Sequence, residues 1–142
     1  NVLEEQNEKL ELISKTDHLT QALSRSEIES QIIQEIKRSD RSKHPIAFVM
    51  LDIDHFKKVN DTYGHETGDQ VLIQFVKIVR ETIRENDLII RFGGDEFILL
   101  LPNTSINNAK ILANKIINRI NEKFQTPNQK KLSVWNLELI YS

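Results

Sequence analysis

The 142 residues are enough for one domain with a sizeable core and too few for two domains of ordinary size. Lysine and arginine together number 19 and aspartate and glutamate 21, so the net charge of -2 gives no electrostatic argument for a nucleic-acid partner or an anionic membrane. Because the chain contains no cysteine, disulfides and thiolate metal ligands are excluded, and we expect a cytoplasmic protein.

The first elements expected along the chain are two helices. Residues 1–15 carry apolar side chains at spacings that suit a linker or stalk helix, with a terminal helix packed on its own domain as the alternative. The next apolar residues recur at helical spacing and predict a helix over about residues 25–42, with one stripe facing a core. That stripe consists of Ile28, Ile32, Ile33 and Ile36.

The period then changes, and strands alternate with helices. The run "IAFVMLDID" (46–54) is predicted as a buried strand, and the polar "HFKKVNDTYGHETG" (55–68) as a loop. Residues 69–84 are predicted as an amphipathic helix, "DLIIRF" and "EFILLL" as strands, and "LSVWNLELIYS" as a last strand. A further helix is expected over residues 105–124, and its inward side chains are Ile106, Ala109, Ile111, Leu112, Ile116, Ile117 and Ile120.

Gly93 and Gly94 join two apolar runs. A two-residue Gly-Gly connection predicts a β-hairpin with a primed turn, which needs positive φ at its centre. Such a hairpin presents Asp95 and Glu96 at or just after its tip.

Two further acids end the first strand. Asp52 and Asp54 are two residues apart, so they share a face or leave the strand on the same side. If this strand and the hairpin are neighbours in one sheet, three or four carboxylates converge, and a cation is needed to keep them ionised. Oxygen ligands without cysteine or histidine favour Mg²⁺ or Mn²⁺ over zinc. The alternative is structural: Asp95 caps the turn and Asp54 caps a following helix.

The segment between the two acid groups carries residues suited to a nucleotide. Lys57 and Lys58 are candidates for phosphate, and an amide with a carboxylate, as in Asn60 and Asp69, matches the edge of guanine. Each has an ordinary alternative. The lysines would form a solvated face, Asn60 and Asp61 would be turn residues, and Asp69 would be a helix N-cap.

The stretch "LDIDHFKKVNDTYGHETGDQVL", followed by "RFGGDEF", resembles the GGDEF family of diguanylate cyclases, and the similarity runs from "DHLT" at Asp17 to about Phe124. The resemblance implies an α/β fold with a palm-like mixed, largely antiparallel sheet flanked by helices. It also implies an enzyme that condenses two GTP molecules into cyclic di-GMP and two pyrophosphates. Such an enzyme works as a homodimer with one GTP in each subunit.

By resemblance, Asp52, the backbone carbonyl of Ile53, Asp95 and Glu96 would bind the metal, Mg²⁺ or Mn²⁺. Asp95 and Glu96 are also the catalytic candidates. Asp95 is the family's candidate for accepting the proton of the attacking 3′-hydroxyl, but the sequence leaves open which of the two removes it.

The resemblance also assigns substrate contacts. In the family one pair of residues cradles phosphate, a second reads guanine, and a third lets GTP lie against the hairpin. The matching positions are Phe56 with Lys57, Asn60 with Asp69, and Gly93 with Gly94.

Arg84 and Asp87, in "RENDLIIRFGGDEF", are similar to the inhibitory product site of the family, where cyclic di-GMP binds. The alternative is that Asp87 caps a strand. The fixed spacing from the Gly-Gly pair favours the inhibitory interpretation.

The chain departs from the family pattern at two places. Gln21 and Ser24 replace a usual glycine and asparagine. At the end, "VWNL" (134–137) stands where the family continues with a strand like "VSIG", and the following helix with its phosphate-binding basic residues is missing. Two explanations of this C-terminal sequence remain open. One is a one-base frame change, which would convert Ile-Gly-Ile codons to Leu-Glu-Leu (137–139). The other is a truncated fragment with a divergent tail. Either predicts exposed apolar sheet surface and weakened activity.

We therefore expect a stalk or linker over residues 1–15 and a GGDEF domain over residues 16–142, with an incomplete or divergent C-terminal strand and helix and with an upstream sensor or membrane segment. The leading hypothesis is a diguanylate cyclase. The alternatives are an impaired module that binds GTP or cyclic di-GMP as a regulator, and an interaction domain that binds neither.

Overall fold

The computed structural model describes residues 15–124 and 135–141, so the stalk helix predicted for residues 1–15 lies outside it apart from Lys15. The chain forms one short 3₁₀ helix, four α-helices and four strands in this part. In order they are η1 (Arg25–Glu27), α2 (Ile28–Ser42), β1 (Ile46–Ile53), α3 (Phe56–Tyr63), α4 (His65–Thr82), β2 (Leu88–Arg91), β3 (Glu96–Pro102), α5 (Ile106–Lys123) and β4 (Trp135–Tyr141).

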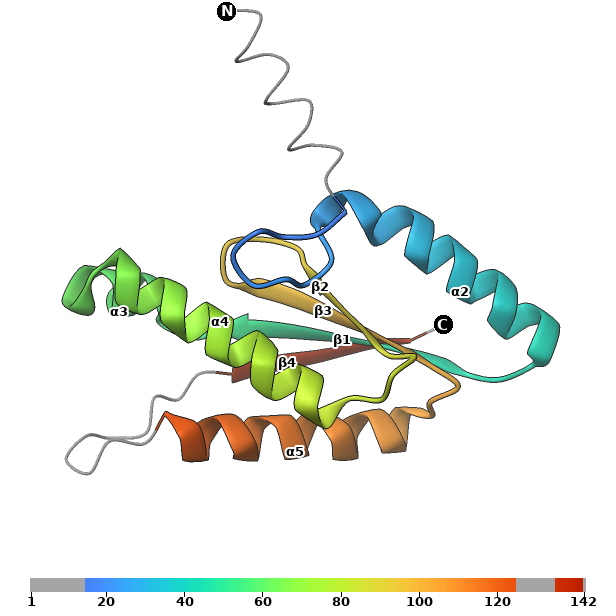
Figure 1. Cartoon of the computed structure of the whole chain (residues 1–142). Coiled ribbons are helices and arrows are strands. Elements are labelled where there is room, and N and C mark those ends of the chain that lie inside the picture. The colour runs from blue at the N-terminus through green and yellow to red at the C-terminus, as the bar shows by residue number, and fades with distance from the viewer. Residues whose placement is uncertain (1–14, 125–134, 142) are drawn as a thin grey trace, which may run out of the picture.

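The four strands form one sheet in the order β2-β3-β1-β4, and each neighbouring pair is antiparallel (Figure 1). The hairpin of β2 and β3 lies beside β1. This is the neighbour relation that the sequence requires if the two groups of acids are to converge. The predicted last strand is confirmed as β4, which pairs with β1 on the other side. In the described part, no helix is long and apolar enough to cross a membrane.

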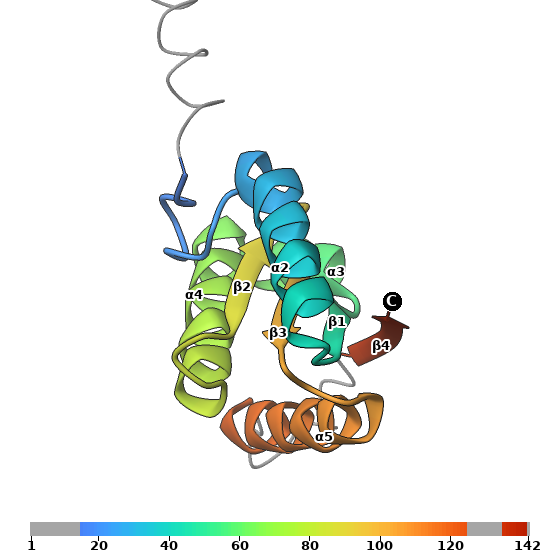
Figure 2. The same ribbon diagram turned by 90° about the vertical axis from the view of Figure 1, so that its right-hand side faces the viewer.

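Helices cover both faces of the sheet (Figure 2). α4 and α5 pack on one face, where alternate side chains of β1 and β3 point into the main core. In that core the rings of Phe75 of α4 and Phe97 of β3 pack edge to face, with 4.8 Å between their centroids. α2 lies on the opposite face. This arrangement of helices on both faces of a sheet confirms the α/β fold class, and among the described residues all three strand pairs of the sheet are antiparallel.

The helix predicted over residues 25–42 exists, but its predicted inward stripe is partly wrong. Ile33 and Ile36 are exposed, at 45% and 37%. The side chains that turn toward the sheet are Ile28, Ile32, Glu35 and Ser39, which follow the i, i+4, i+7, i+11 spacing of one helix face. Buried Glu35 is tolerated there because Arg38 binds its carboxylate at 2.7 Å.

One inward residue predicted for the helix over 105–124 is also wrong. Ile111 is 65% exposed, whereas Ala109, Ala113, Ile116 and Ile120 are buried on the side that meets the sheet. The apolar pattern of α5 is wider than the surface available to cover it. Ser105 caps the helix by accepting a hydrogen bond from the backbone N–H of Asn108 at 3.2 Å.

The predicted loop over residues 55–68 is wrong, because α3 and the first turn of α4 occupy it. Val59 is buried on α3, so the polar sequence conceals a short amphipathic helix. Gly64 separates the two helices with φ 91°, a conformation that glycine adopts at little cost. α4 therefore begins at His65, earlier than the predicted residue 69.

Candidate functional site

The ladder between β1 and β3 brings the predicted acids together at one end of the sheet. Asp52 is the direct cross-strand partner of Glu96, and the N–H of Ile53 donates to the carbonyl of Asp95 at 3.1 Å. Asp54 follows the last residue of β1. Two predicted metal-binding groups far apart in the sequence thus meet because β1 and β3 are neighbours.

The carboxyl group of Asp52 is held in an unfavourable setting for a negative charge. Burial raises its pKa above the ordinary value, and the charge of Asp95, a hydrogen bond between the two carboxyl groups, and the charges of Glu96 and Asp54 raise it further. Among the described residues, Oδ1 of Asp52 is buried without a hydrogen-bond partner. A buried, unpartnered carboxylate oxygen amid other carboxylates is a suitable donor for a hard divalent cation.

The side chains do not stand in a closed ligand cage. Within residues 15–124 and 135–141, no group of three or more acidic or histidine side chains is close enough together to hold an ion. The backbone of the site is thus arranged by the β1–β3 ladder, while a bound cation would require the carboxylates to turn toward one point.

The hairpin is confirmed, but the predicted primed turn is wrong. β2 ends at Arg91 and β3 begins at Glu96, so residues 92–95 form the connection. The N–H groups of Phe92 and Gly93 both donate to the carbonyl of Glu96, at 2.8 and 3.1 Å. This wider connection reverses the chain without a positive φ at either glycine.

One of the two hairpin glycines lies close to the side chain of Glu96. A Cβ at Gly93 would lie 3.1 Å from Oε2 of Glu96, closer than a side chain normally tolerates, whereas Gly94 has open space around it. The GTP contacts of both glycines stay predictions.

Asn60 and Asp69 are brought near one another by a close contact between α3 and α4. A Cβ at Gly68 would lie 1.7 Å from Oδ1 of Asn60 and 3.3 Å from the ring of Phe56. The Asn60 side chain therefore rests on the backbone of α4 immediately before Asp69. Asn60 lies within α3 and Asp69 within α4, so their alternative roles as a turn residue and a helix N-cap are wrong.

The candidate phosphate residues begin α3. Phe56 is half-buried and Lys57 is exposed, as is Lys58. His55 is the N-cap with φ 58°, and the described helix has no side-chain cap at this end, so the alternative in which Asp54 caps it is wrong. Both lysines are therefore exposed at the start of a helix and close in sequence to the acid cluster.

The candidate product site is a compact hydrogen-bond network around Arg84. Arg84 donates to Oδ1 of Asp87 at 3.1 Å, to the carbonyl of Pro102 at 2.7 Å and to the hydroxyl of Thr104 at 2.6 Å. Buried Asp87 also accepts from the backbone N–H of Arg84 at 2.8 Å, so it closes the turn before β2. Arg84 and Asp87 both line a cavity of about 340 Å³.

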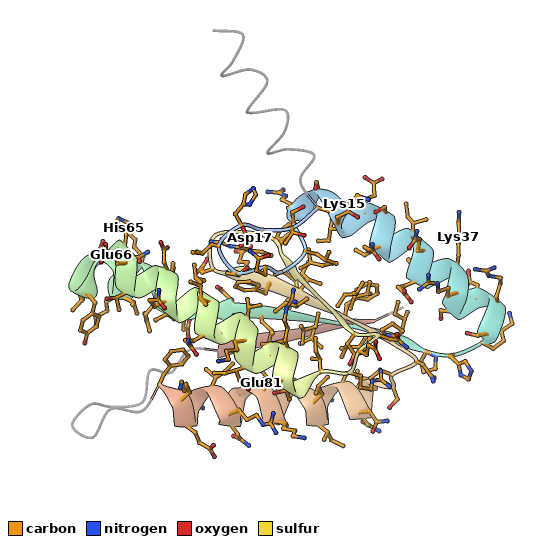
Figure 3. All side chains as sticks on the ribbon, viewed as in Figure 1. Lys15, Asp17, Lys37, His65, Glu66 and Glu81 are labelled. Carbon is orange, nitrogen blue, oxygen red and sulfur yellow. The ribbon has the colours of Figure 1, made fainter. Side chains whose placement is uncertain are left out.

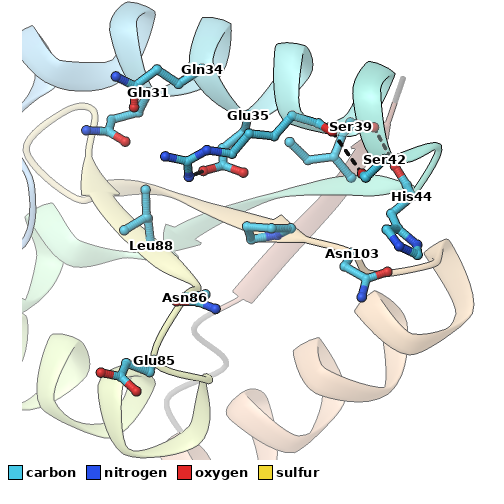
Figure 4. Close-up of a pocket in the computed structure, with 13 residues that line it drawn as sticks. Gln31, Gln34, Glu35, Ser39, Ser42, His44, Glu85, Asn86, Leu88 and Asn103 are labelled. Carbon is cyan, nitrogen blue, oxygen red and sulfur yellow. Dashed lines mark hydrogen bonds and ion pairs between the residues drawn. The ribbon is translucent and has the colours of Figure 1, made fainter.

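A second cavity, of about 410 Å³, lies between α2 and the turn before β2 (Figure 4). It holds none of the residues predicted for metal, substrate or product. Its walls carry Gln31, Glu35, Arg38, Glu85 and Asn86, among others.

Sequence reasoning missed the residues that support the site. Arg91 binds Asp17 and two carbonyls of the hairpin, Gly68 makes room for Asn60, and Arg25 lies over the ring of Phe92 at 4.7 Å. The only signal was "DHLT", which marked Asp17 as part of the resemblance without giving it a role.

An antiparallel sheet with helices on both faces gathers carboxylates at the end of two adjoining strands, which defines an α/β domain with a candidate cation site. A family model described as "Diguanylate cyclase, GGDEF domain" matches residues 14–138, and the chain belongs to this family.

The known relatives agree. The chain is 39% identical over 114 residues to diguanylate cyclase DgcP of Pseudomonas aeruginosa, covering 80% of this chain and 16% of that protein. It is 41% identical over 99 residues to diguanylate cyclase A of Treponema denticola, covering 70% of this chain and 27% of that protein. The chain therefore spans about a quarter or less of the length of these relatives.

A solved structure gives the same result for the fold. The crystal structure of diguanylate cyclase SiaD from Pseudomonas aeruginosa, in complex with its activator SiaC, superposes with a TM-score of 0.73 at 31% identity. The match covers 99% of this chain and 55% of that chain.

Proposed function

We propose that this chain is a diguanylate cyclase domain that condenses two GTP molecules into cyclic di-GMP. Each 3′-hydroxyl attacks the α-phosphate of the other GTP, so two O–P bonds form, two bonds to pyrophosphate break, and two protons leave the hydroxyl groups. Family membership supports this reaction class. The observation that carries the proposal is the pairing of Asp52 with Glu96, beside Asp95 and with one buried Asp52 oxygen that lacks a partner among the described residues.

Asp52, the carbonyl of Ile53, Asp95 and Glu96 are the residues that would hold Mg²⁺ or Mn²⁺. A bound divalent cation supplies charge neutralisation at the triphosphate and lowers the pKa of the attacking hydroxyl. Asp95, which ends the hairpin connection, or Glu96, which begins β3, accepts the proton of that hydroxyl. The raised pKa of Asp52 is consistent with a cluster that binds a cation, because a cation relieves the repulsion that raises it.

The remaining contacts position the substrate. Asn60 and Asp69, which adjoin through Gly68, read the edge of guanine. Phe56 and Lys57 bind phosphate at the start of α3. Gly93 and Gly94 would let GTP lie against the hairpin. Positioning of this kind supplies most of the rate in nucleotidyl transfer.

The reaction requires two copies of the site. Each GTP is both nucleophile and electrophile in a symmetric product, and each chain carries one set of the residues assigned above. A homodimer related by two-fold symmetry brings the two hydroxyls and the two α-phosphates face to face.

Arg84 and Asp87 are proposed as a feedback site for cyclic di-GMP. The cavity that they line also carries Lys115 and the exposed Ile111, a combination of positive charge and apolar surface that suits phosphates and purine rings. The carboxylate of Asp87 holds the Arg84 guanidinium in place for a phosphate.

The test is incubation of the purified chain with GTP and Mg²⁺ at protein concentrations that favour a dimer, with products separated by chromatography. Asp95→Asn, which keeps the shape of the side chain, serves as the matched variant. Cyclic di-GMP formed by the parent chain and reduced by at least about a hundredfold in the variant supports the proposal. Equal product from both would contradict it.

A module that binds GTP or cyclic di-GMP without turnover is the second candidate. It is favoured by the open arrangement of the acidic side chains within the described residues. Calorimetry with GTP and Mg²⁺ separates the two, because a binder takes up nucleotide and forms no product.

A further inference from the structure

One arginine fastens the loop that precedes η1 to the hairpin turn. From Nη1, Arg91 donates to both carboxylate oxygens of Asp17 at 3.1 Å. From Nε and Nη2 it donates to the carbonyls of Gly93 at 3.3 Å and Gly94 at 2.8 Å. Asp17 lies in the loop that runs alongside the hairpin (Figure 3), so a single guanidinium joins this loop to two peptide groups of the turn.

The ion pair between Arg91 and Asp17 is largely buried and is held by further hydrogen bonds. The exposed fractions of the Arg91 and Asp17 side chains are 19% and 22%. Asp17 also accepts hydrogen bonds from the backbone N–H and the hydroxyl of Thr20, at 2.9 and 2.7 Å. Burial alone would raise the pKa of Asp17, but these hydrogen bonds and the charge of Arg91 outweigh it, so the pKa lies below its ordinary value and the group stays ionised.

The carbonyl of Gly94 belongs to the peptide group whose nitrogen is that of Asp95. A donor that fixes this carbonyl therefore fixes the direction in which the chain enters Asp95. On the other side, the carbonyl of Asp95 accepts from the N–H of Ile53. We propose that Arg91, held by Asp17, is a positioning residue that sets the hairpin turn so that Asp95 and Glu96 face the β1 acids. The catalytic consequence rests on the proposed function.

Other contacts attach the same loop to β2 independently of the ion pair. Leu23 donates to the carbonyl of Ile89 at 3.0 Å and accepts from the N–H of Arg91 at 2.8 Å, and Arg25 lies over Phe92. Loss of the guanidinium therefore leaves the loop attached and releases the turn. If Arg91 only stabilised the fold, its loss would reduce protection throughout the domain, whereas a positioning role predicts a change confined to the hairpin turn.

The experiment compares Arg91→Gln, Arg91→Lys, Asp17→Asn and the double variant Asp17→Asn/Arg91→Gln with the parent chain. Arg119→Gln is the matched control, since Arg119 is an exposed arginine of α5 that makes one hydrogen bond to Thr82. Amide hydrogen exchange is measured by NMR on nucleotide-free protein. Initial rates then give kcat and KM for GTP separately.

In Arg91→Gln we expect amide exchange at residues 93–95 to rise by about fivefold or more while the α4 and α5 amides are unchanged. We expect kcat to fall by about tenfold or more with KM nearly constant. Arg91→Lys behaves in the same way, because an ammonium group does not reach the carboxylate and both carbonyls in one plane. The double variant matches Arg91→Gln alone, because Asp17 acts through Arg91.

Unchanged exchange at residues 93–95 in Arg91→Gln would overturn the proposal, as would equal loss of protection in the hairpin and in α4. If Arg91→Gln fails to fold, Asp17→Asn carries the test, since it keeps the arginine and can keep a side-chain acceptor for Thr20. The exchange measurement needs no nucleotide. A failure of the proposed function, with no cyclic di-GMP from the parent chain, is therefore distinguishable from a failure of this inference.

Discussion

Asp52 and Glu96 face each other directly across the antiparallel ladder of β1 and β3, and Asp95 is next to them in the chain. Like charges on directly opposed residues destabilise a sheet, so this pairing lowers the stability of the fold, and the proposed cation would relieve that repulsion. The same relationship makes the cluster testable without any nucleotide.

The first prediction concerns Asp52→Asn. The pKa of Asp52 is raised in the folded state, so the folded chain binds this proton more tightly than the unfolded chain, and ionisation at neutral pH destabilises the fold. We expect the variant to be more stable than the parent chain at pH 7 without metal, by about 1 kcal/mol or less. The difference shrinks as the pH falls below the raised pKa of the folded chain, and it disappears below the ordinary pKa of the unfolded chain, where Asp52 is neutral in both states.

Thermal unfolding over a pH series, with and without Mg²⁺, measures this effect. Mg²⁺ raises the Tm of the parent chain and leaves that of Asp52→Asn nearly unchanged. Ser30→Ala, on the exposed surface of α2, is a control that changes neither comparison. A variant less stable than the parent at pH 7 would contradict the proposed repulsion.

The second prediction concerns Gly68→Ala. Alanine favours the helical state of α4 by about 1 kcal/mol, but its Cβ cannot stay within 1.7 Å of Oδ1 of Asn60. We expect the Asn60 amide to be displaced and the affinity for GTP to fall by about tenfold or more, with unfolding stability changed much less.

The control is the same substitution in an Asn60→Ala background. There the obstructed amide is gone, so Gly68→Ala should raise the unfolding midpoint and have no further effect on GTP affinity. Additive losses of affinity in the double variant would mean that Gly68 and Asn60 act independently.

The larger pattern of the fold could be predicted because hydrophobic periodicity reflects burial. The strand that carries Asp52, the hairpin through Gly93 and Gly94, and the last strand were all predicted and are present. The short α3 was missed because Phe56 and Val59 are its few core-directed residues, and eight residues give little periodicity.

The acidic residues of the candidate site could be predicted from their residue types. The residues that hold the surrounding backbone in place could not. The acids carried their own signal, since carboxylates gathered at strand ends need a cation. Arg91 looked like an ordinary strand residue, and its role depends on Asp17, which is remote in the sequence. A contact between distant residues has no local pattern, and neither does the packing of Gly68 on Asn60.

The third prediction concerns Arg84→Gln. Arg84 lies away from the acid cluster, on the turn before β2, and joins Asp87 to Pro102 and Thr104. We expect the initial rate of GTP turnover to stay within about twofold of the parent, while inhibition by added cyclic di-GMP weakens by about tenfold or more. Loss of turnover without any change in inhibition would contradict this division between a catalytic and a product site.

The last prediction concerns Gln21, which stands where the family usually has glycine. Its φ is 65°, so a residue with a Cβ adopts a left-handed conformation that costs about 1 kcal/mol relative to glycine. The loop is held there because Gln21 donates its N–H to the carbonyl of Asp17 at 2.9 Å and its own carbonyl accepts from Arg80. We expect Gln21→Gly to raise the free energy of unfolding by up to about 1 kcal/mol.

Gln21→Ala separates backbone strain from the loss of the side chain, which donates to the carbonyl of His18 at 3.0 Å. Alanine removes that hydrogen bond and keeps the strain, so this variant should be equal to or slightly less stable than the parent chain in urea denaturation. Glycine removes both and should be the most stable of the three. If Gln21→Gly and Gln21→Ala unfold at the same urea concentration, the left-handed backbone costs nothing here, and the departure from the family residue has no effect on stability.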